Sequence, residues 1–249
     1  QAEDGIRDAD DAVGVLMNKL DDLGVSDETA VLVSSDHGEA FGELGVYADH
    51  QAADEATCHI PAVLHWPDLD PQVNKGLHYH LDIATTVVDL AGLRIPRHWD
   101  GISLLKNLET QSDGGRDHLI LSQGAWSCQR SVRWQDHLYM RTWHDGYHGH
   151  WEEEMLFNIA KDPHEQNNLA INESHLINEG STILQNWTSE QLAKSYSPID
   201  PMEVVLDEGG PFHVRGHLPA YLDRLRETGR SHWAEILEDR HPSVLKLEE

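Results

Sequence analysis

A short polar motif, Asp36-His37-Gly38, directly follows an apolar run rich in β-branched residues. This run, residues 29–35, predicts a strand that is buried on both faces. Ligands of open α/β sheets bind beyond the carboxyl ends of strands, which is where Asp36 and His37 would lie. Aspartate offers a hard oxygen and histidine an imidazole nitrogen, so the pair predicts a metal site. The alternative is that Asp36 caps the next segment and His37 is an ordinary loop residue.

A second histidine, His50, lies thirteen positions after His37. Histidine exchanges protons near neutral pH, so His50 could donate to an anionic oxygen or protonate a leaving group. In a chain with 18 histidines, such a neighbour is a weak signal by itself. His50 becomes a candidate catalytic residue because of its relation to the Asp36-His37 motif.

Hydrophobic periodicity predicts the elements that must position these residues. Apolar residues recur at helical spacing from Ile6 to Leu23, and Gly24 follows as a natural stop. Residues 60–67 predict a second strand, and residues 80–90 predict a second helix that ends at Gly92. Together these segments predict an α/β domain over residues 1–110, with a mixed sheet flanked by helices.

The pattern changes after residue 110. Three short strand-like segments, residues 118–122, 130–134 and 137–142, are separated by polar turns and predict a small antiparallel subdomain over residues 111–171. Helical patterns at 177–192 and 218–237, joined through a loop at 206–211, predict a helical tail over residues 172–249. Arg130 and Arg133 alternate with apolar residues, which predicts solvent-facing charge, with an anion contact as the alternative. His144, His148 and His150 predict a polar hairpin tip, with the lining of a substrate mouth as the alternative.

The charge balance excludes some classes of partner. Forty-four acidic residues against eighteen basic ones give a net charge of −26, which repels nucleic acid and anionic membrane surfaces. The same acid-rich, lysine-poor composition suggests adaptation to concentrated salt. No apolar run approaches the roughly 18 residues that a membrane span needs, and the first 20 residues lack a signal-peptide layout. We therefore expect a soluble chain without a membrane span and slightly favour the cytoplasm. A signal peptide removed by N-terminal truncation would leave no trace in this sequence, so the compartment stays open.

Several motifs occur in an order that resembles the second half of the sulfatase catalytic domain, in the alkaline phosphatase superfamily. They are S-D-H-G-E at 35–39, G-E-L-G-V-Y-A-D-H at 42–50, H-I-P at 59–61, W-P at 66–67, L-D-I-A-T-T at 81–86, D-G-I-S-L at 100–104, and L-F-N…D-P-H-E…N-L from 156 to 169. The resemblance implies an alkaline-phosphatase-like α/β fold, partial in this chain. It also implies hydrolysis of a small-molecule or saccharide sulfate ester.

The resemblance also implies roles for individual residues. Asp36 and His37 would be ligands of one divalent metal ion, and His50 lies at or next to the position where relatives place a lysine or histidine that contacts the sulfate. Ca²⁺ is the expected ion. Mn²⁺ and Zn²⁺ are alternatives, because His37 stands where many sulfatases have asparagine.

The nucleophile that the resemblance requires is absent from this sequence. Sulfatases use a formylglycine made from cysteine or serine in a C/S-x-P-x-R motif, and neither Cys58 nor Cys128 lies in such a motif. We therefore expect the formylglycine in an N-terminal half that lies outside this sequence. The alternatives are a phosphodiesterase or phosphonate monoester hydrolase on the same fold, or a non-catalytic binding fragment. The sequence makes no prediction about oligomeric state.

Overall fold

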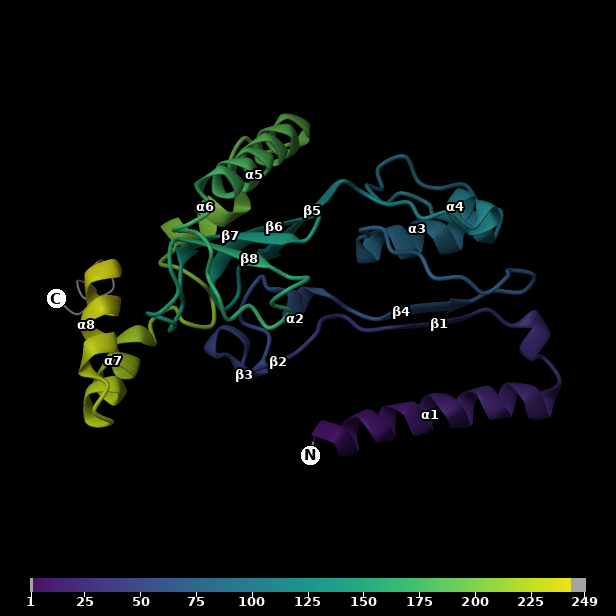
Figure 1. Ribbon diagram of the computed structural model, residues 1–249, viewed down its shortest axis with the longest axis horizontal. Helices are drawn as coiled ribbons and strands as arrows, with labels where there is room; N and C mark the ends of the chain where they lie inside the picture. The colour runs from purple at the N-terminus through teal and green to yellow at the C-terminus, as the bar shows by residue number, and fades with distance from the viewer. Residues whose placement is uncertain (1, 243–249) are drawn as a thin grey trace. The chain divides into compact units, whose positions relative to one another are not determined.

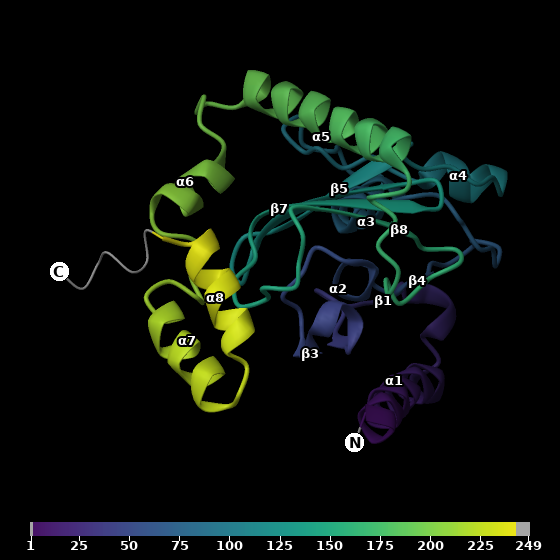
Figure 2. The same ribbon diagram turned by 60° about the vertical axis from the view of Figure 1, so that its left-hand side comes forward.

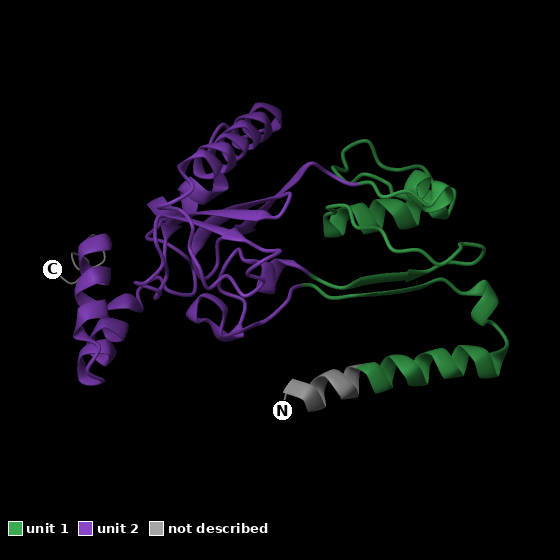
Figure 3. Cartoon of the chain, in the orientation of Figure 1, with its two compact units in different colours: residues 1–36, 60–114 green, residues 37–59, 115–249 purple. Residues whose placement is uncertain are grey.

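The computed structural model describes residues 2–242, with side chains from residue 10 onward. It contains two compact units (Figure 3). The first comprises Gln1–Asp36 and Ile60–Gly114, and the second comprises His37–His59 and Gly115–Glu249. The segment that follows Asp36 therefore packs with the C-terminal part of the chain. The division into three domains at residues 110 and 171 stays a prediction.

The first unit confirms the predicted helices and strands. Its elements are α1 (Ala2–Leu23), η1 (Ser26–Glu28), β1 (Val31–Ser34), β4 (Ala62–His65), α3 (His80–Leu90) and α4 (Leu105–Thr110). Strands β1 and β4 pair antiparallel, with Val31 opposite His65 (Figure 1). The expected burial of β1 on both faces is wrong: Leu32 is 44% exposed, because β1 belongs to a ribbon of only two strands among the described residues.

Two of the recognised motifs form one hydrogen-bonded contact in the first unit. The carboxylate of Asp82 in α3 accepts the backbone N–H of Tyr79 at 2.8 Å and that of Ile102 at 2.7 Å. One helical turn later, the hydroxyl of Thr86 accepts the N–H of Leu104 at 2.9 Å. The L-D-I-A-T-T and D-G-I-S-L motifs are therefore the two sides of the same contact.

The second unit is built on a four-stranded antiparallel sheet in the order β5-β6-β7-β8. The strands are β5 (His118–Gln123), β6 (Cys128–Trp134), β7 (His137–His144) and β8 (Glu154–Asn158), which confirms the predicted antiparallel sheet. One face is covered by α5 (Ser174–Lys194). The other is covered by β2 (Ala40–Phe41), η2 (Glu43–Gly45), β3 (Tyr47–Asp49) and α2 (Glu55–Cys58) (Figure 1).

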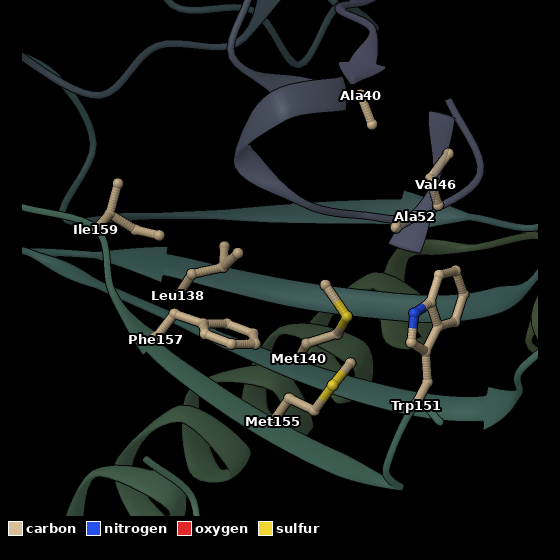
Figure 4. Close-up of a cluster of buried hydrophobic side chains, with 9 residues drawn as sticks. All are labelled: Ala40, Val46, Ala52, Leu138, Met140, Trp151, Met155, Phe157 and Ile159. Carbon is tan, nitrogen blue, oxygen red and sulfur yellow. The ribbon is translucent and has the colours of Figure 1, made fainter. Parts of the chain in front are cut away.

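Alternating side chains divide the sheet between these two layers. Leu138 and Met140 of β7 lie in the cluster with Ala52 and Trp151 (Figure 4), whereas Tyr139 lies in the cluster with Leu184 of α5. Successive residues of a strand point to opposite faces, so both sets are buried. This explains why most residues of β6, β7 and β8 are buried.

Among the described residues, the helical tail has three more helices: α6 (Pro201–Asp207), α7 (Leu218–Glu227) and α8 (Ser231–Arg240). The single helix predicted over 218–237 is wrong, because a turn at Gly229, with φ of 75°, separates α7 from α8. The predicted loop at 206–211 also starts too early, since Leu206 and Asp207 end α6. Helices α7 and α8 lie side by side (Figure 2). They share an apolar cluster that includes Leu222. No helix among the described residues is long and apolar enough to cross a membrane.

Candidate functional site

A hairpin in the second unit brings two predicted site residues together. Strand β2 pairs with β3, with Ala40 opposite Asp49. His37 lies shortly before β2 and His50 directly follows β3, so the pairing places both histidines at the open end of the hairpin. Glu39 joins them, and one potential ligand atom from each of His37, Glu39 and His50 lies within 4.8 Å of the others.

Gly38 has a steric reason for its identity. Its N–H donates to the carbonyl of Thr57 at 2.7 Å, so the motif backbone runs against α2. A Cβ added at Gly38 would lie 2.0 Å from the carbonyl oxygen of Ala56, which is well inside van der Waals contact. Only glycine fits here without moving the backbone that carries His37.

Asp36 stands at the other end of the same motif. It lies at a bend two residues after β1 and is the last residue of the first unit. The cluster at the hairpin contains His37 and His50 but not Asp36. Glu39 is the carboxylate that sequence reasoning missed. The available signal was its position two residues after His37 within the recognised motif.

The rings of His37 and His50 are stacked, with centroids 3.8 Å apart and planes inclined by 29°. The lone pair of an imidazole nitrogen lies in the plane of its ring. Two rings stacked in this way direct their lone pairs past each other, so these rotamers do not let both histidines bind one ion. In these rotamers, the stacking therefore allows at most one of the two histidines to bind an ion.

Carboxylates surround the inner nitrogen of His50. Its Nδ1 is buried without a hydrogen-bond partner, 3.7 Å from Oε2 of Glu39 and 3.5 Å from Oδ1 of Asp49. Asp49 is itself fixed, because its carboxylate accepts the N–H of His50 at 2.7 Å and Nε2 of Gln51 at 2.8 Å. A proton on Nδ1 would thus face two carboxylates, which leaves Nε2 as the nitrogen available to a substrate.

His148, from the loop after β7, contacts the Gln51 side chain that holds Asp49. Nε2 of His148 lies 2.6 Å from Oε1 of Gln51. The amide nitrogen of Gln51 already donates to Asp49, so its oxygen accepts and Nε2 of His148 donates. Burial, followed by His150, lowers the pKa of His148 to about 4, and the neutral ring stacks on Trp151 at 4.0 Å.

The polar hairpin tip expected for His144, His148 and His150 is therefore wrong for two of them. His148 packs against Gln51 and Trp151, and His144 is only 8% exposed. His144 stacks on His241 with centroids 3.9 Å apart and planes inclined by 16°. Although these two histidines lie close to Asp145, nearly parallel rings cannot direct lone pairs at a common ion. This group is a hydrogen-bonded stack in which Nε2 of His241 contacts Oδ1 of Asp145 at 2.7 Å.

The expectation that Arg130 and Arg133 face solvent is also wrong. Arg130 is 8% exposed, and its guanidinium forms two hydrogen bonds of 2.5 Å with Asp200. Nε of Arg133 lies 3.3 Å from Oε2 of Glu55, beside α2. Both faces of β6 are covered, so each arginine meets a carboxylate from the layer on its own side.

Comparisons with known proteins show which family this chain is similar to. Residues 3–93 match the sulfatase family model. The ulvan-active sulfatase of Formosa agariphila is 28% identical over 64% of this chain, and the N-acetylglucosamine-6-O-sulfatase of Bacteroides thetaiotaomicron is 26% identical over 80% of it. The chain spans 32% and 37% of the lengths of these two enzymes.

Solved structures show the same fold. A structure in complex with its substrate D-glucosamine-2-N,6-O-disulfate superposes with a TM-score of 0.64 at 23% identity, covering 78% of this chain and 40% of that one. A phosphonate monoester hydrolase from Silicibacter pomeroyi gives a TM-score of 0.61 at 20% identity, covering 75% and 39%. The chain is thus similar to sulfatases in sequence over residues 3–93, and its α/β architecture is a part of their fold.

Proposed function

We propose that the intact protein hydrolyses sulfate esters of a small molecule or saccharide. Asp36 and His37 serve as metal ligands, and His50 contacts the sulfate group. The observation that carries this proposal is the meeting of His37 and His50 at one hairpin end, within a chain that is similar to sulfatases. Relatives of similar sequence are named as sulfatases of saccharides, which supports a sulfated saccharide as the substrate.

The proposal includes one divalent metal ion, Ca²⁺ first and Mn²⁺ or Zn²⁺ as alternatives, and a formylglycine supplied from outside this sequence. Bound there, the ion would polarise the ester oxygens and the formylglycine would provide the nucleophile. Asp36 offers an oxygen ligand and His37 a nitrogen ligand. Glu39 is a further oxygen donor beside His37.

His50 has a separate task in this proposal. Its Nδ1 faces the carboxylates of Glu39 and Asp49, and its Nε2 remains for the substrate. A histidine in this position can donate a hydrogen bond to an anionic sulfate oxygen or protonate the leaving alcohol.

The test compares substrates with the intact protein. We expect metal-dependent turnover of a chromogenic aryl sulfate that stops on chelation with EDTA and returns with Ca²⁺ or Mn²⁺. The His50→Ala variant should lower kcat by about 100-fold, the lower range of general acid–base contributions. Absence of sulfate ester turnover in the intact, metal-loaded protein would reject the proposal.

One alternative function has a specific observation in its favour. The Asp36-His37 pair places histidine where many sulfatases have asparagine, and imidazole suits Mn²⁺ or Zn²⁺ better than Ca²⁺. A phosphodiesterase or phosphonate monoester hydrolase would then turn over an aryl phosphate diester or phosphonate faster than the aryl sulfate. A binding fragment would turn over none of these compounds.

A second aspect of the proposal concerns habitat. The net charge of −26 suits a protein that works in concentrated salt, because salt screens the repulsion between its many carboxylates. We infer salt adaptation from this composition.

A further inference from the structure

The segment that carries His50 continues into a buried stretch without regular secondary structure. Residues 50–54 form neither helix nor strand, yet Ala52, Ala53 and Asp54 are at most 1% exposed. Buried backbone N–H and C=O groups need partners. The carbonyl of Asp54 accepts the N–H of Cys58 in α2 at 3.0 Å, whereas the residues before Asp54 are bonded mainly by side chains.

Strand β6 supplies some of these side-chain partners, because every second residue of the strand faces the His50 segment. Ser131 is opposite Met140, whose side chain lies in the cluster with Ala52. Residues two positions apart point to the same face, so Gln129, Ser131 and Arg133 all face the layer that contains the His50 segment. Gln129 and Ser131 are 0% exposed, although apolar residues usually fill such positions.

Side chains form hydrogen bonds with the backbone of four residues in this region: His50, Gln51, Ala53 and Glu55. Gln123 Nε2 donates to the carbonyl of His50 at 2.8 Å, and Ser127 Oγ donates to that of Gln51 at 2.9 Å. For Ala53, the N–H donates to Gln129 Oε1 at 3.2 Å and the carbonyl accepts from Ser131 Oγ at 2.5 Å. The N–H of Glu55 donates to Glu165 Oε1 at 2.7 Å.

These contacts span large distances in the sequence. The five donors and acceptors lie 73 to 110 residues from their backbone partners. They come from β5, the β5–β6 turn, β6 and the turn after β8, so they share no local structure with His50. We refer to Gln123, Ser127, Gln129, Ser131 and Glu165 as the template residues.

We propose that the template residues are positioning residues for His50: they fix the backbone of residues 50–55 and thereby hold the imidazole beside His37. The contribution of the C-terminal sheet to the site is then the conformation of this segment. Ser127 holds the backbone of Gln51, and the side chain of Gln51 in turn fixes the carboxylate of Asp49 beside His50. The catalytic consequence rests on the proposed function, whereas the constraint on the segment does not.

Gln123→Glu tests the proposal with a change of one atom. The new carboxylate keeps the oxygen that accepts the N–H groups of Gly124 and Ala125, but it loses the Nε2–H that donates to His50. Gln72→Glu is the matched control, because Nε2 of Gln72 donates to the carbonyl of Leu108 at 2.8 Å in the first unit. Ser131→Ala is a second test variant that removes a single hydroxyl.

Two readouts separate positioning from general stability. Hydrogen exchange of a peptide covering residues 50–58 should quicken about fivefold in Gln123→Glu and in Ser131→Ala, which is the effect expected for one lost hydrogen bond. The Gln72→Glu control should leave this peptide unchanged. In the intact protein, both test variants should lower kcat for the aryl sulfate about tenfold with KM within twofold of the wild type.

The outcomes distinguish the two proposals. Unchanged hydrogen exchange of residues 50–58 in both test variants would overturn the proposal that the template residues fix this segment. An equal rise in its exchange rate in the Gln72→Glu control would also overturn it. If exchange quickens but KM rises while kcat is constant, the residues stabilise substrate binding and do not position His50. If exchange quickens while even the wild-type protein turns over no sulfate ester, the constraint on the segment stands and the proposed function fails.

Discussion

The imidazole rings of His37 and His50 lie face to face, with their centroids 3.8 Å apart, at the open end of the β2–β3 hairpin. Two residues that are thirteen positions apart in the sequence are thus in direct contact. The nitrogen lone pairs of stacked rings do not converge on one ion, which is consistent with the different tasks proposed for the two residues. This relationship makes the two roles separable by mutation.

Metal binding should distinguish the two histidines. We expect His37→Ala to weaken the binding of Mn²⁺ or Ca²⁺ to the intact protein by at least about tenfold, because it removes a ligand. His50→Ala should change the dissociation constant by less than about threefold while it lowers turnover. Isothermal titration calorimetry provides the measurement, and equal losses in the two variants would show that His50 is also a ligand.

The stability of the protein should decrease as the pH rises from 4.5 to about 8. Burial, followed by the carboxylate of Asp54, raises the pKa of Glu165 to about 8 from an ordinary value of 4.5. The folded protein thus retains a proton that the unfolded chain has lost, and this contribution to stability disappears as pH rises through 8. Between pH 6.5 and 8.5, the free energy of unfolding should fall by up to about 1.4 kcal/mol per pH unit.

Glu165→Gln should remove most of this slope, because glutamine is uncharged and keeps the oxygen that accepts the N–H of Glu55. Urea unfolding at pH 6.5, 7.5 and 8.5 measures the effect. Glu190→Gln on the exposed side of α5 is the control and should keep the wild-type slope. A wild-type protein with constant stability over this range would contradict a protonated Glu165.

Breaking the buried ion pair between Arg130 and Asp200 should strongly lower the free energy of unfolding. Asp200 also accepts the N–H of Met202 at 2.9 Å at the start of α6, and the guanidinium of Arg130 lies over Trp187 at 5.4 Å. Asp200→Ala leaves a buried charge without its partner, so we expect a loss of roughly 3–5 kcal/mol in the free energy of unfolding.

The control for the ion pair is Glu153→Gln, which breaks the contact between Arg141 and a 71% exposed glutamate side chain. Such surface pairs contribute about 0–1 kcal/mol. Urea unfolding followed by circular dichroism measures both variants. Losses of similar size would mean that the Arg130–Asp200 pair behaves as an exposed one.

Gly38 and Gly14 should respond oppositely to alanine. A Cβ at Gly38 would lie 2.0 Å from the carbonyl oxygen of Ala56, so Gly38→Ala should cost about 1–3 kcal/mol of stability and abolish turnover in the intact protein. Gly14 lies within α1 and has no atom within 4 Å of its would-be Cβ, so Gly14→Ala should stabilise the chain by roughly 1 kcal/mol. Thermal unfolding of both variants checks the pair, and a neutral Gly38→Ala would reject the close approach to α2.

Salt should stabilise this protein if its acidic surface is an adaptation to salt. At roughly 1 M KCl, charges separated by more than about 3 Å are largely screened, which relieves repulsion among the carboxylates. We expect the midpoint of urea unfolding to rise between 0.1 M and 2 M KCl. A midpoint that is constant or falls would argue against salt adaptation.

The sequence by itself predicted the local elements and the family. Apolar periodicity located α1, α3 and α5 and the strands β1, β4, β5, β6 and β7, because these patterns depend on which side of each element is buried. The spacing of the D-H-G-E motif and of the later motifs predicted sulfatase ancestry, which the comparisons confirm. The roles of Asp36, His37 and His50 stay predictions.

Only the tertiary structure decided which distant side chains surround His50. Gln129 and Ser131 look like ordinary strand residues, and nothing in their spacing shows that they bond to Ala53, more than seventy residues away. Arg130 and Arg133 resembled solvent-facing charge because alternation gives the face of a strand but not what covers that face. Periodicity reports the burial of one element, whereas the site depends on hydrogen bonds between elements, which form only when the chain is folded.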